Sequence, residues 1–194
     1  MNVREFLSNI LMIKDNCLLS SLFSMCKVTE VSKGECVIQQ GKIPSQIIFV
    51  VEGIFRGCIS DEYGKDITDC FLYEPGQVLI ASFNLDEPAL ISIEALVQSS
   101  ILCISILNFK NLVINYPGLY EIYSKSVLES SKLHWDLKIL TYQYTAKQRY
   151  NWFLKNYPGM IEKISHKYIA SFLNMTPVTL SRLIHDQYKI KKEN

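Results

Sequence analysis

The chain has 194 residues, of which 48% are hydrophobic and 20% are charged. This composition, with 11 Tyr and 9 Phe, excludes a disordered chain and is typical of one or two globular domains. No apolar run reaches the roughly 18 residues of a membrane span. The N-terminus, which carries Arg4 and Glu5, lacks the apolar core of a signal peptide. We therefore expect a cytoplasmic protein without a membrane partner.

The net charge of +1 is unevenly distributed along the chain. Residues 1–146 hold 11 Lys/Arg and 16 Asp/Glu, a net of −5, whereas residues 147–194 hold 9 Lys/Arg and 3 Asp/Glu, a net of +6. The basic C-terminal segment indicates either an anionic partner at that end or a solvated basic face, and charge alone does not decide between them.

The sequence offers no convincing site for a metal, a cofactor or catalysis. The six cysteines form no C-x-x-C pair and are interpreted as reduced, buried structural residues. The three histidines, His134, His166 and His185, lie near no nucleophile motif, and Glu87 and Glu94 form no convincing acid/base pair. We expect no enzyme activity, no metal and no cofactor.

The spacing of hydrophobic residues divides the chain into three regions. Residues 3–24 have helical spacing and predict a broken pair of short helices. From Val28 onward, short β-prone runs alternate with turn signals every 8–12 residues, which is typical of an all-β sandwich or barrel. The expected strands are residues 47–51, 54–60, 67–73, 78–83, 90–97 and 101–106.

A long helix is expected over residues 115–145, because no Gly or Pro occurs between Gly118 and Pro158. Its apolar residues recur at alternating spacings of three and four, like the a and d positions of a coiled coil. This pattern predicts either a dimerisation helix or a long helix packed on its own domain. For a dimer, the interface residues would be Leu133, Leu137, Leu140 and Tyr144.

Residues 164–186 have the signals of two short helices joined by a three-residue turn. Ser165 is suited to cap the first helix, and Asn174 tolerates the left-handed conformation at its end. Thr176 would cap the second helix, with Pro177 at its first position. Two such helices form the DNA-reading helix-turn-helix, or else a helical hairpin that serves only packing.

For a DNA-reading motif, the second helix presents one polar face. Arg182 can donate two hydrogen bonds to a guanine edge, and Lys189, Lys191 and Lys192, expected beyond the helix, can contact phosphates. The candidate DNA-binding residues are Lys167, Thr176, Val178, Thr179, Ser181, Arg182 and His185.

Over nearly its whole length, the chain resembles the Crp/Fnr family of transcription regulators. The resemblance lies in the order of these regions and in several short sequence fragments. The resemblance implies an α+β fold: an N-terminal β jelly roll like a cyclic-nucleotide-binding domain over 1–114, a dimerisation helix over 115–145, and a helical helix-turn-helix domain over 146–194. The matching fragments are residues 33–35, 41, 48–53, 69–76, 92–96, 169–173 and 179–182.

The chain departs from the members of this family that bind cyclic AMP. In those members, the segment that binds the cyclic phosphate usually carries a Gly-Glu pair followed by an Arg. Here Gln77 follows Gly76, and no Lys or Arg occurs between Lys65 and Lys110. A buried phosphate without a counter-charge is poorly compensated, so we expect no cyclic AMP binding. The candidate effector-pocket residues are Gly76, Gln77, Ser82, Phe83, Ser92 and Ile93.

The resulting hypothesis is a homodimeric transcription regulator that reads a palindromic operator under the control of an unidentified effector. Its candidate partners are double-stranded DNA, a second copy of the chain, RNA polymerase and a small-molecule effector. In the reading helix, Val178 stands where many family members have a Glu that reads cytosine. This departure leaves an alternative open, namely a sensor or interaction protein of the same fold with degenerate DNA contacts.

Overall fold

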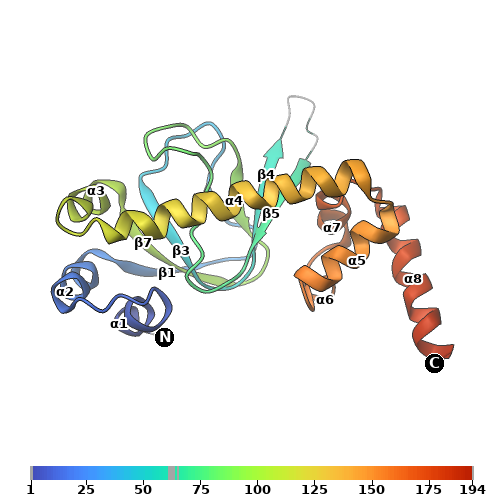
Figure 1. Cartoon of the computed structure of the whole chain (residues 1–194), viewed down its shortest axis with the longest axis horizontal. Helices are drawn as coiled ribbons and strands as arrows, with labels where there is room; N and C mark the ends of the chain where they lie inside the picture. Colours follow the sequence, from blue (N-terminus) through green and yellow to red (C-terminus); the bar gives the residue numbers. More distant parts are fainter. Residues whose placement is uncertain (1, 61–63, 65, 194) are drawn as a thin grey trace.

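The computed structural model describes residues 2–60, 64 and 66–193, with side chains described as far as Gln187. Short helices open the chain, a β domain follows, and one long helix leads to a group of helices at the C-terminus (Figure 1). The long helix runs across the β domain and carries the C-terminal helices beyond its far end (Figure 1). Within the described part of the chain, no helix combines the length and apolar character that crossing a membrane requires.

The N-terminal segment forms the expected broken pair of short helices. Asn2 caps the first turn through a capping box with Glu5, and the Asp15 side chain accepts a hydrogen bond from the Leu18 N–H at the start of the next helix. Their apolar side chains pack on one face of the β domain. The elements are α1 (Val3–Glu5), the π-helical turn η1 (Phe6–Ile10) and α2 (Asn16–Met25).

The β domain contains two antiparallel sheets, with the strand orders β1-β7-β3 and β2-β6-β4-β5. Alternation along β3 separates two cores: Ile47 and Phe49 pack against the helices, whereas Ile48 and Val50 pack between the sheets. The expected jelly roll, and with it the α+β fold class, is confirmed. The strands are β1 (Lys27–Val31), β2 (Cys36–Ile38), β3 (Gln46–Glu52), β4 (Phe55–Ser60), β5 (Asp66–Leu72), β6 (Ser92–Ala95) and β7 (Ser99–Ser105).

The strand expected over residues 78–83 is not formed, and this prediction was wrong. Only one isolated bridge, between Phe49 and Val78, joins this segment to β3. The Leu79 N–H still donates to the Ile48 carbonyl of β3 at 2.9 Å, and further along the loop the Leu90 N–H donates to the Ala81 carbonyl at 2.7 Å. The segment thus leaves the sheet edge after two residues and curves back on itself. An apolar run can be buried in such a loop as well as in a strand, so hydrophobicity alone predicted a strand where a loop forms.

Helices form the rest of the chain. The long helix α4 falls within the expected range and ends before Thr145, which caps the following helix through a capping box with Gln148. The C-terminal helices close around a core that includes Phe153, Ile169 and Leu180, each fully buried. These helices are α3 (Ile106–Asn115), α4 (Gly118–Gln143), α5 (Ala146–Asn156), α6 (Met160–Lys163), α7 (His166–Phe172) and α8 (Pro177–Glu193).

The cysteines are free thiols with different surroundings. Cys58, Cys70 and Cys103 are buried in the β domain, whereas Cys17 and Cys36 are exposed. Burial raises the pKa of Cys58 and of Cys103 to about 11, which keeps both groups protonated at neutral pH. The interpretation as buried structural residues therefore holds for Cys58, Cys70 and Cys103 and fails for Cys17 and Cys36.

Candidate DNA-binding face and effector pocket

Helices α7 and α8 form the helix-turn-helix geometry with the local signals that the sequence carries. The Ser165 hydroxyl accepts a hydrogen bond from the Lys167 N–H at 3.3 Å, at the start of α7. Asn174 adopts a left-handed conformation with a φ of 49° and ends the first helix. The Thr176 hydroxyl then accepts from the Thr179 N–H at 3.1 Å and caps α8.

One face of α8 is bare. The Val178 side chain is 61% exposed, and Ser181, Arg182 and His185 are exposed beside it, whereas Leu180 on the opposite face is fully buried. The remaining candidates are also accessible, since Lys167 and Thr176 are exposed and Thr179 is half-buried. The Thr176 and Thr179 hydroxyls lie 2.9 Å apart and bond to each other.

The second helix is longer than expected. α8 continues to Glu193, so Lys189, Lys191 and Lys192 belong to the helix and not to a tail beyond it. That part of the prediction was wrong. The cap at Thr176 and the proline at 177 correctly predicted where the helix begins. The sequence has no Gly or Pro after Pro177 that would end it. The side chains of these lysines lie outside the described residues.

Arg149 fixes the turn between the two helices, and the sequence reasoning did not single it out. Its Nε donates to the Leu173 carbonyl at 2.8 Å and one terminal nitrogen donates to the Asn174 carbonyl at 3.2 Å. The other terminal nitrogen donates to the Tyr144 carbonyl at 2.8 Å, at the end of α4. One guanidinium thus joins the long helix to the helix-turn-helix turn. No local motif marks such a contact, because the partners are 24 and 25 residues away.

The C-terminal helices are docked on the β domain through a second arginine. The Arg56 side chain on β4 is 4% exposed and forms ion pairs with Asp66 at 3.0 Å and with Glu94 at 2.8 Å. The guanidinium carbon lies 3.9 Å from the centroid of the Tyr168 ring on α7. Next to it, the Thr68 N–H of β5 donates to the Ser171 hydroxyl of α7 at 2.9 Å. The stack of Arg56 on Tyr168 and the hydrogen bond from the Thr68 main chain to the Ser171 side chain therefore hold α7 against the sheet, and the two ion pairs fix the Arg56 guanidinium in place.

An aromatic cluster completes this docking. Phe71 of β5 is 2% exposed and its ring centroid lies 5.0 Å from that of Phe172, 6.1 Å from that of Tyr157 and 6.3 Å from that of Phe153. Tilted and edge-to-face pairs at these separations are favourable. Because Phe71 comes from the β domain and its neighbours from α5 and α7, the two parts of the chain share one hydrophobic core.

A hollow of about 280 Å³ lies between the β domain and α4. Of the predicted pocket residues, Ser82 and Phe83 line it. Gly76 and Gln77 do not line it; Gln77 accepts hydrogen bonds from the Tyr73 and Glu74 N–H groups and borders a separate cavity on the other flank of α4. The hollow's remaining lining residues are Ile59, Asp69, Ile80, Ala81, Leu90, Ile91, Ser130 and His134.

Ser92 and Ile93 also lie away from this hollow. The Ser92 hydroxyl accepts a hydrogen bond from the Gln40 N–H at 3.0 Å, and Ile93 is fully buried between the sheets. Both residues belong to β6, where alternate side chains point to opposite faces. Of the six candidate pocket residues, Ser82 and Phe83 therefore line this hollow, and their role in effector binding stays a prediction.

The two ionisable side chains at the hollow pair with each other. His134 Nε2 on α4 lies 3.1 Å from both Asp69 carboxylate oxygens on β5. This hydrogen bond raises the pKa of His134 above its ordinary value of 6.5, against the opposing effect of its partial burial. The other lining residues are uncharged, and most are apolar.

Comparisons with known proteins agree with this architecture. Residues 28–116 match the family model of the cyclic nucleotide-binding domain. FixK2 from Bradyrhizobium japonicum superposes with a TM-score of 0.71 at 17% identity, covering 86% of each chain. A CooA mutant from Carboxydothermus hydrogenoformans gives a TM-score of 0.71 at 19% identity, covering 98% of this chain and 85% of that one.

A regulator from Eubacterium rectale, assigned to the Crp/Fnr family, gives a TM-score of 0.68 at 15% identity and covers 94% of this chain and 87% of its own. The chain has the Crp/Fnr fold. The resemblance seen in the sequence fragments is thereby confirmed at the level of the fold. A search of curated proteins finds no match to this sequence.

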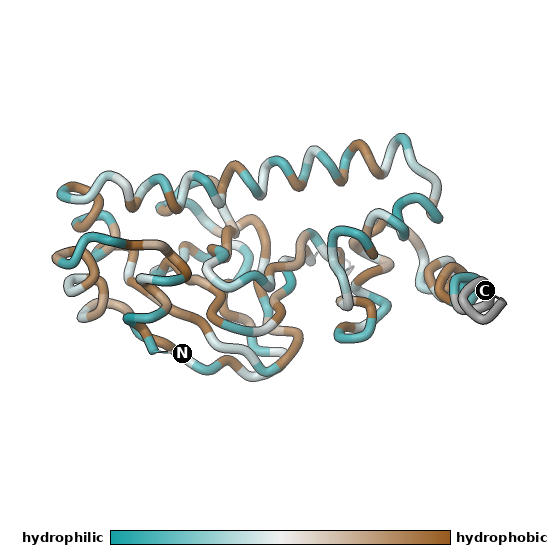
Figure 2. Tube along the Cα trace, turned by 60° about the horizontal axis from the view of Figure 1, so that its bottom comes forward, coloured by the Kyte–Doolittle hydropathy of each residue, from teal (hydrophilic) through white to brown (hydrophobic). Residues whose placement is uncertain are grey.

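Within the Crp/Fnr fold, α4 of this chain carries apolar residues on two opposite faces. Hydrophobic and hydrophilic residues alternate along its length (Figure 2). Three of the four residues predicted for a dimer interface face the chain itself: Leu140 is 4% exposed, and Leu133 and Leu137 pack against the cores. Tyr144 is the C-cap residue and is partly exposed. The side chains of Leu133, Leu137 and Leu140 thus pack within the protomer.

The opposite face of α4 is bare. Four large hydrophobic side chains on it are spaced by seven, four and three residues, which places them in one stripe. They are Leu128, Trp135, Ile139 and Tyr142, with exposures of 69%, 62%, 44% and 81%. The periodicity thus identified a helix with an apolar seam correctly, but it could not distinguish the covered seam from the bare one.

Proposed function

We propose that this chain is a homodimeric transcription regulator that binds double-stranded DNA through α8. The observation that carries the proposal is the bare face of α8 on a rigidly supported helix-turn-helix. Leu180 is fully buried on the inner side, whereas Arg182 is exposed on the outer side. A helix that enters the major groove needs this division between a packed face and a free face. The net charge of +6 over residues 147–194 supports an anionic partner.

Arg182 reads sequence in this proposal. It follows Val178 by one helical turn on the exposed face, and its planar guanidinium can donate two parallel hydrogen bonds to a guanine. Val178 offers only apolar contact, for example to a thymine methyl group. Lys167, Thr176 and Ser181 supply phosphate contacts, which position the helix without distinguishing sequences.

Dimerisation occurs through the bare face of α4. The stripe of Leu128, Trp135, Ile139 and Tyr142 has the spacing of a coiled-coil seam, and a second copy of the chain would cover it. Two protomers related by two-fold symmetry would read half-sites about 34 Å apart, which defines a palindromic operator. This proposal assigns dimerisation to the face of α4 opposite the seam expected from the sequence.

The effector is an uncharged or weakly polar molecule that binds in the hollow beside α4. No Lys or Arg lines this hollow among the described residues, and Asp69 already engages His134. A cyclic phosphate would therefore meet a carboxylate and no permanent cation. We expect calorimetry with cyclic AMP to show no binding at micromolar concentrations. Micromolar affinity would contradict this part of the proposal.

The DNA-binding proposal is tested by Arg182→Ala, with Lys27→Ala as the matched control. Both changes remove one exposed positive charge, but Lys27 lies on β1, at the other end of the molecule (Figure 1). Binding to the upstream region of the chain's own gene and to a scrambled duplex is measured by fluorescence anisotropy at two salt concentrations. Arg182→Ala should reduce the preference for the specific duplex by about 1–3 kcal/mol. Equal losses on both duplexes would contradict the assignment.

No preference of the wild-type protein for any natural duplex would favour the alternative, a sensor or interaction protein of this fold.

The dimer is tested separately by light scattering. Trp135→Asp places a charge in the stripe and should give a monomer, whereas Thr141→Asp adds the same charge at an exposed position beside the stripe and should leave the dimer intact. A Trp135→Asp dimer would show that another surface forms the interface.

A further inference from the structure

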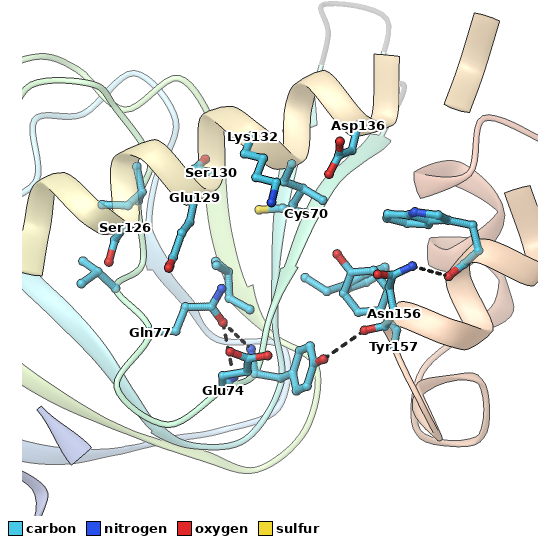
Figure 3. A pocket seen from close by; sticks show the side chains of 17 residues that line it. Cys70, Glu74, Gln77, Ser126, Glu129, Ser130, Lys132, Asp136, Asn156 and Tyr157 are labelled. Carbon is cyan, nitrogen blue, oxygen red and sulfur yellow. Dashed lines mark hydrogen bonds between the residues drawn. The ribbon is translucent and has the colours of Figure 1, made fainter. Parts of the chain in front are cut away.

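A second hollow lies on the other flank of α4, at the junction of three parts of the molecule. It has a volume of about 410 Å³ and is bounded by the end of β5 and the turn after it, by α4, and by α5 (Figure 3). Ile80 and Ser130 contribute to both this junction cleft and the effector hollow and stand between them. Its size falls within the roughly 300–1,000 Å³ of small-molecule sites.

The walls of the junction cleft differ from those of the effector hollow in their charge. Glu129 and Asp136 project from α4, and Glu74 lies on the opposite wall (Figure 3). Lys132 is the one lining residue that is positively charged among the described residues. The four side chains sum to a formal charge of −2, counted as three carboxylates and one ammonium group.

These charges are largely unengaged within the chain. Lys132 and Asp136 are one helical turn apart, yet neither forms an ion pair or a side-chain hydrogen bond among the described residues. The Glu74 carboxylate likewise has no such partner in the described part of the chain. Glu129 approaches only Lys125, at 3.8 Å on the exposed surface. The carboxylates are therefore free to accept hydrogen bonds from a bound molecule.

Aromatic rings form the end of the cleft toward the C-terminal helices. Trp152 and Tyr157 line it from α5 and its C-terminus, with ring centroids 6.0 Å apart, and Tyr73 lines it from the β domain. Burial and the Glu74 carboxylate together raise the pKa of Tyr73, so its phenol stays uncharged at neutral pH. Rings beside carboxylates attract a positively charged group with an apolar body.

We propose that the junction cleft binds a small organic amine. Its protonated amino group would donate hydrogen bonds to Asp136 and the neighbouring carboxylates, and its apolar or aromatic body would lie against Trp152 and Tyr157. An anion would be repelled by the net negative charge, and a fully apolar molecule would leave the carboxylates without partners. A ligand here would contact the β domain, α4 and the C-terminal helices at once.

Binding is tested on the full-length protein without DNA, so its outcome is independent of the proposed function. The probe is phenethylamine, and phenylacetate is the matched ligand with a similar body and the opposite charge. Calorimetric titration should show saturable binding of phenethylamine and none of phenylacetate at the same concentration. In a Trp135→Phe background, Trp152 is the only remaining tryptophan, and its fluorescence should change with the same saturation curve.

Two carboxyl-to-amide changes locate the site. Asp136→Asn should weaken phenethylamine binding about tenfold, because a hydrogen bond between two charged groups is lost. Glu162→Gln removes the same charge from an exposed position on α6 and should leave the affinity unchanged. Folding of each variant is checked by circular dichroism and thermal unfolding, which also identifies any variant that fails to fold.

Several outcomes would overturn the proposal. Equal affinity for phenethylamine and phenylacetate would show that charge does not select the ligand. Equal effects of Asp136→Asn and Glu162→Gln would show that the amine binds elsewhere or only through the overall charge. Loss of binding on Phe83→Ala, but not on Asp136→Asn, would place the amine in the effector hollow. Absence of any saturable binding of phenethylamine would reject the site.

Discussion

The two helices of the helix-turn-helix have opposite surroundings, although they are joined by a short turn. Tyr168 and Ser171 of α7 contact the β domain through a stacked arginine and a hydrogen bond, whereas Val178 and Arg182 of α8 point into solvent. The comparison shows how one motif can be held rigidly and still present a free surface. The first helix provides the attachment, and the second provides the face that is available to a partner.

Removing the aromatic attachment should have the largest effect. Phe71→Ala would leave a cavity in the core shared by β5 and α7, and we expect it to lower the free energy of unfolding by about 3–5 kcal/mol. The measurement is urea unfolding followed by tryptophan fluorescence and circular dichroism. Phe23→Ala, at a position 55% exposed on α2, should change stability by less than about 0.5 kcal/mol. Equal effects would show that Phe71 does not join the two parts.

Breaking the charged attachment should have a smaller effect. Arg56→Met removes the partner of two carboxylates that are each about a quarter exposed, so we expect a loss of about 2–3 kcal/mol, below the ~3–5 kcal/mol of a fully buried pair. Arg56→Lys keeps the charge but not the planar stack on Tyr168 and should lie in between. Hydrogen exchange should accelerate at the Thr68 amide in Arg56→Met. An unchanged exchange rate at the Thr68 amide would show that Arg56 does not hold α7 against the β domain.

The free helix can be weakened without touching its attachment. Thr176→Ala removes the cap of α8 and should cost about 1 kcal/mol, with faster exchange confined to the first turn of that helix. Thr176→Ser keeps a hydroxyl that accepts from the Thr179 N–H and should restore most of the loss. A failure of serine to restore stability would assign the effect to the threonine methyl group instead.

The smallest expected effect depends on pH. The Asp69 hydrogen bond raises the pKa of His134, so the folded state binds this proton more tightly than the unfolded state. Its stabilisation is complete below the ordinary pKa of 6.5 and is lost as the pH rises through the raised value. His134→Gln should therefore reduce stability by less than about 1 kcal/mol at acidic pH and by nothing at alkaline pH. The opposite trend would contradict the pairing.

Local signals were sufficient to predict the helix-turn-helix. The caps at Ser165 and Thr176 and the left-handed Asn174 depend on chain neighbours only, and the structure shows all three. The range of α4 followed from the absence of Gly and Pro for the same reason. The segment over 78–83 failed because an apolar run reports burial and does not report hydrogen-bonding partners.

Contacts between segments that are far apart in the chain could not be predicted from the sequence. Arg56 and Arg149 look like ordinary charged residues, and only the fold brings Tyr168 or the Leu173 carbonyl to them. The covered seam of α4 shows the same limit, because its period identified Leu137 as a seam residue without showing that the chain's own core covers it. The junction cleft likewise requires three segments that are far apart in the chain.

The shared aromatic core also bears on the order in which the chain folds during synthesis. Phe71 emerges from the ribosome long before Phe153, Tyr157 and Phe172, so β5 can be in place when the last helices appear. The nascent C-terminal helices then condense on a preformed template. A fragment that begins at Ala146 would lack this template and expose aromatic rings that the intact protein buries, which makes it a poor candidate for independent expression.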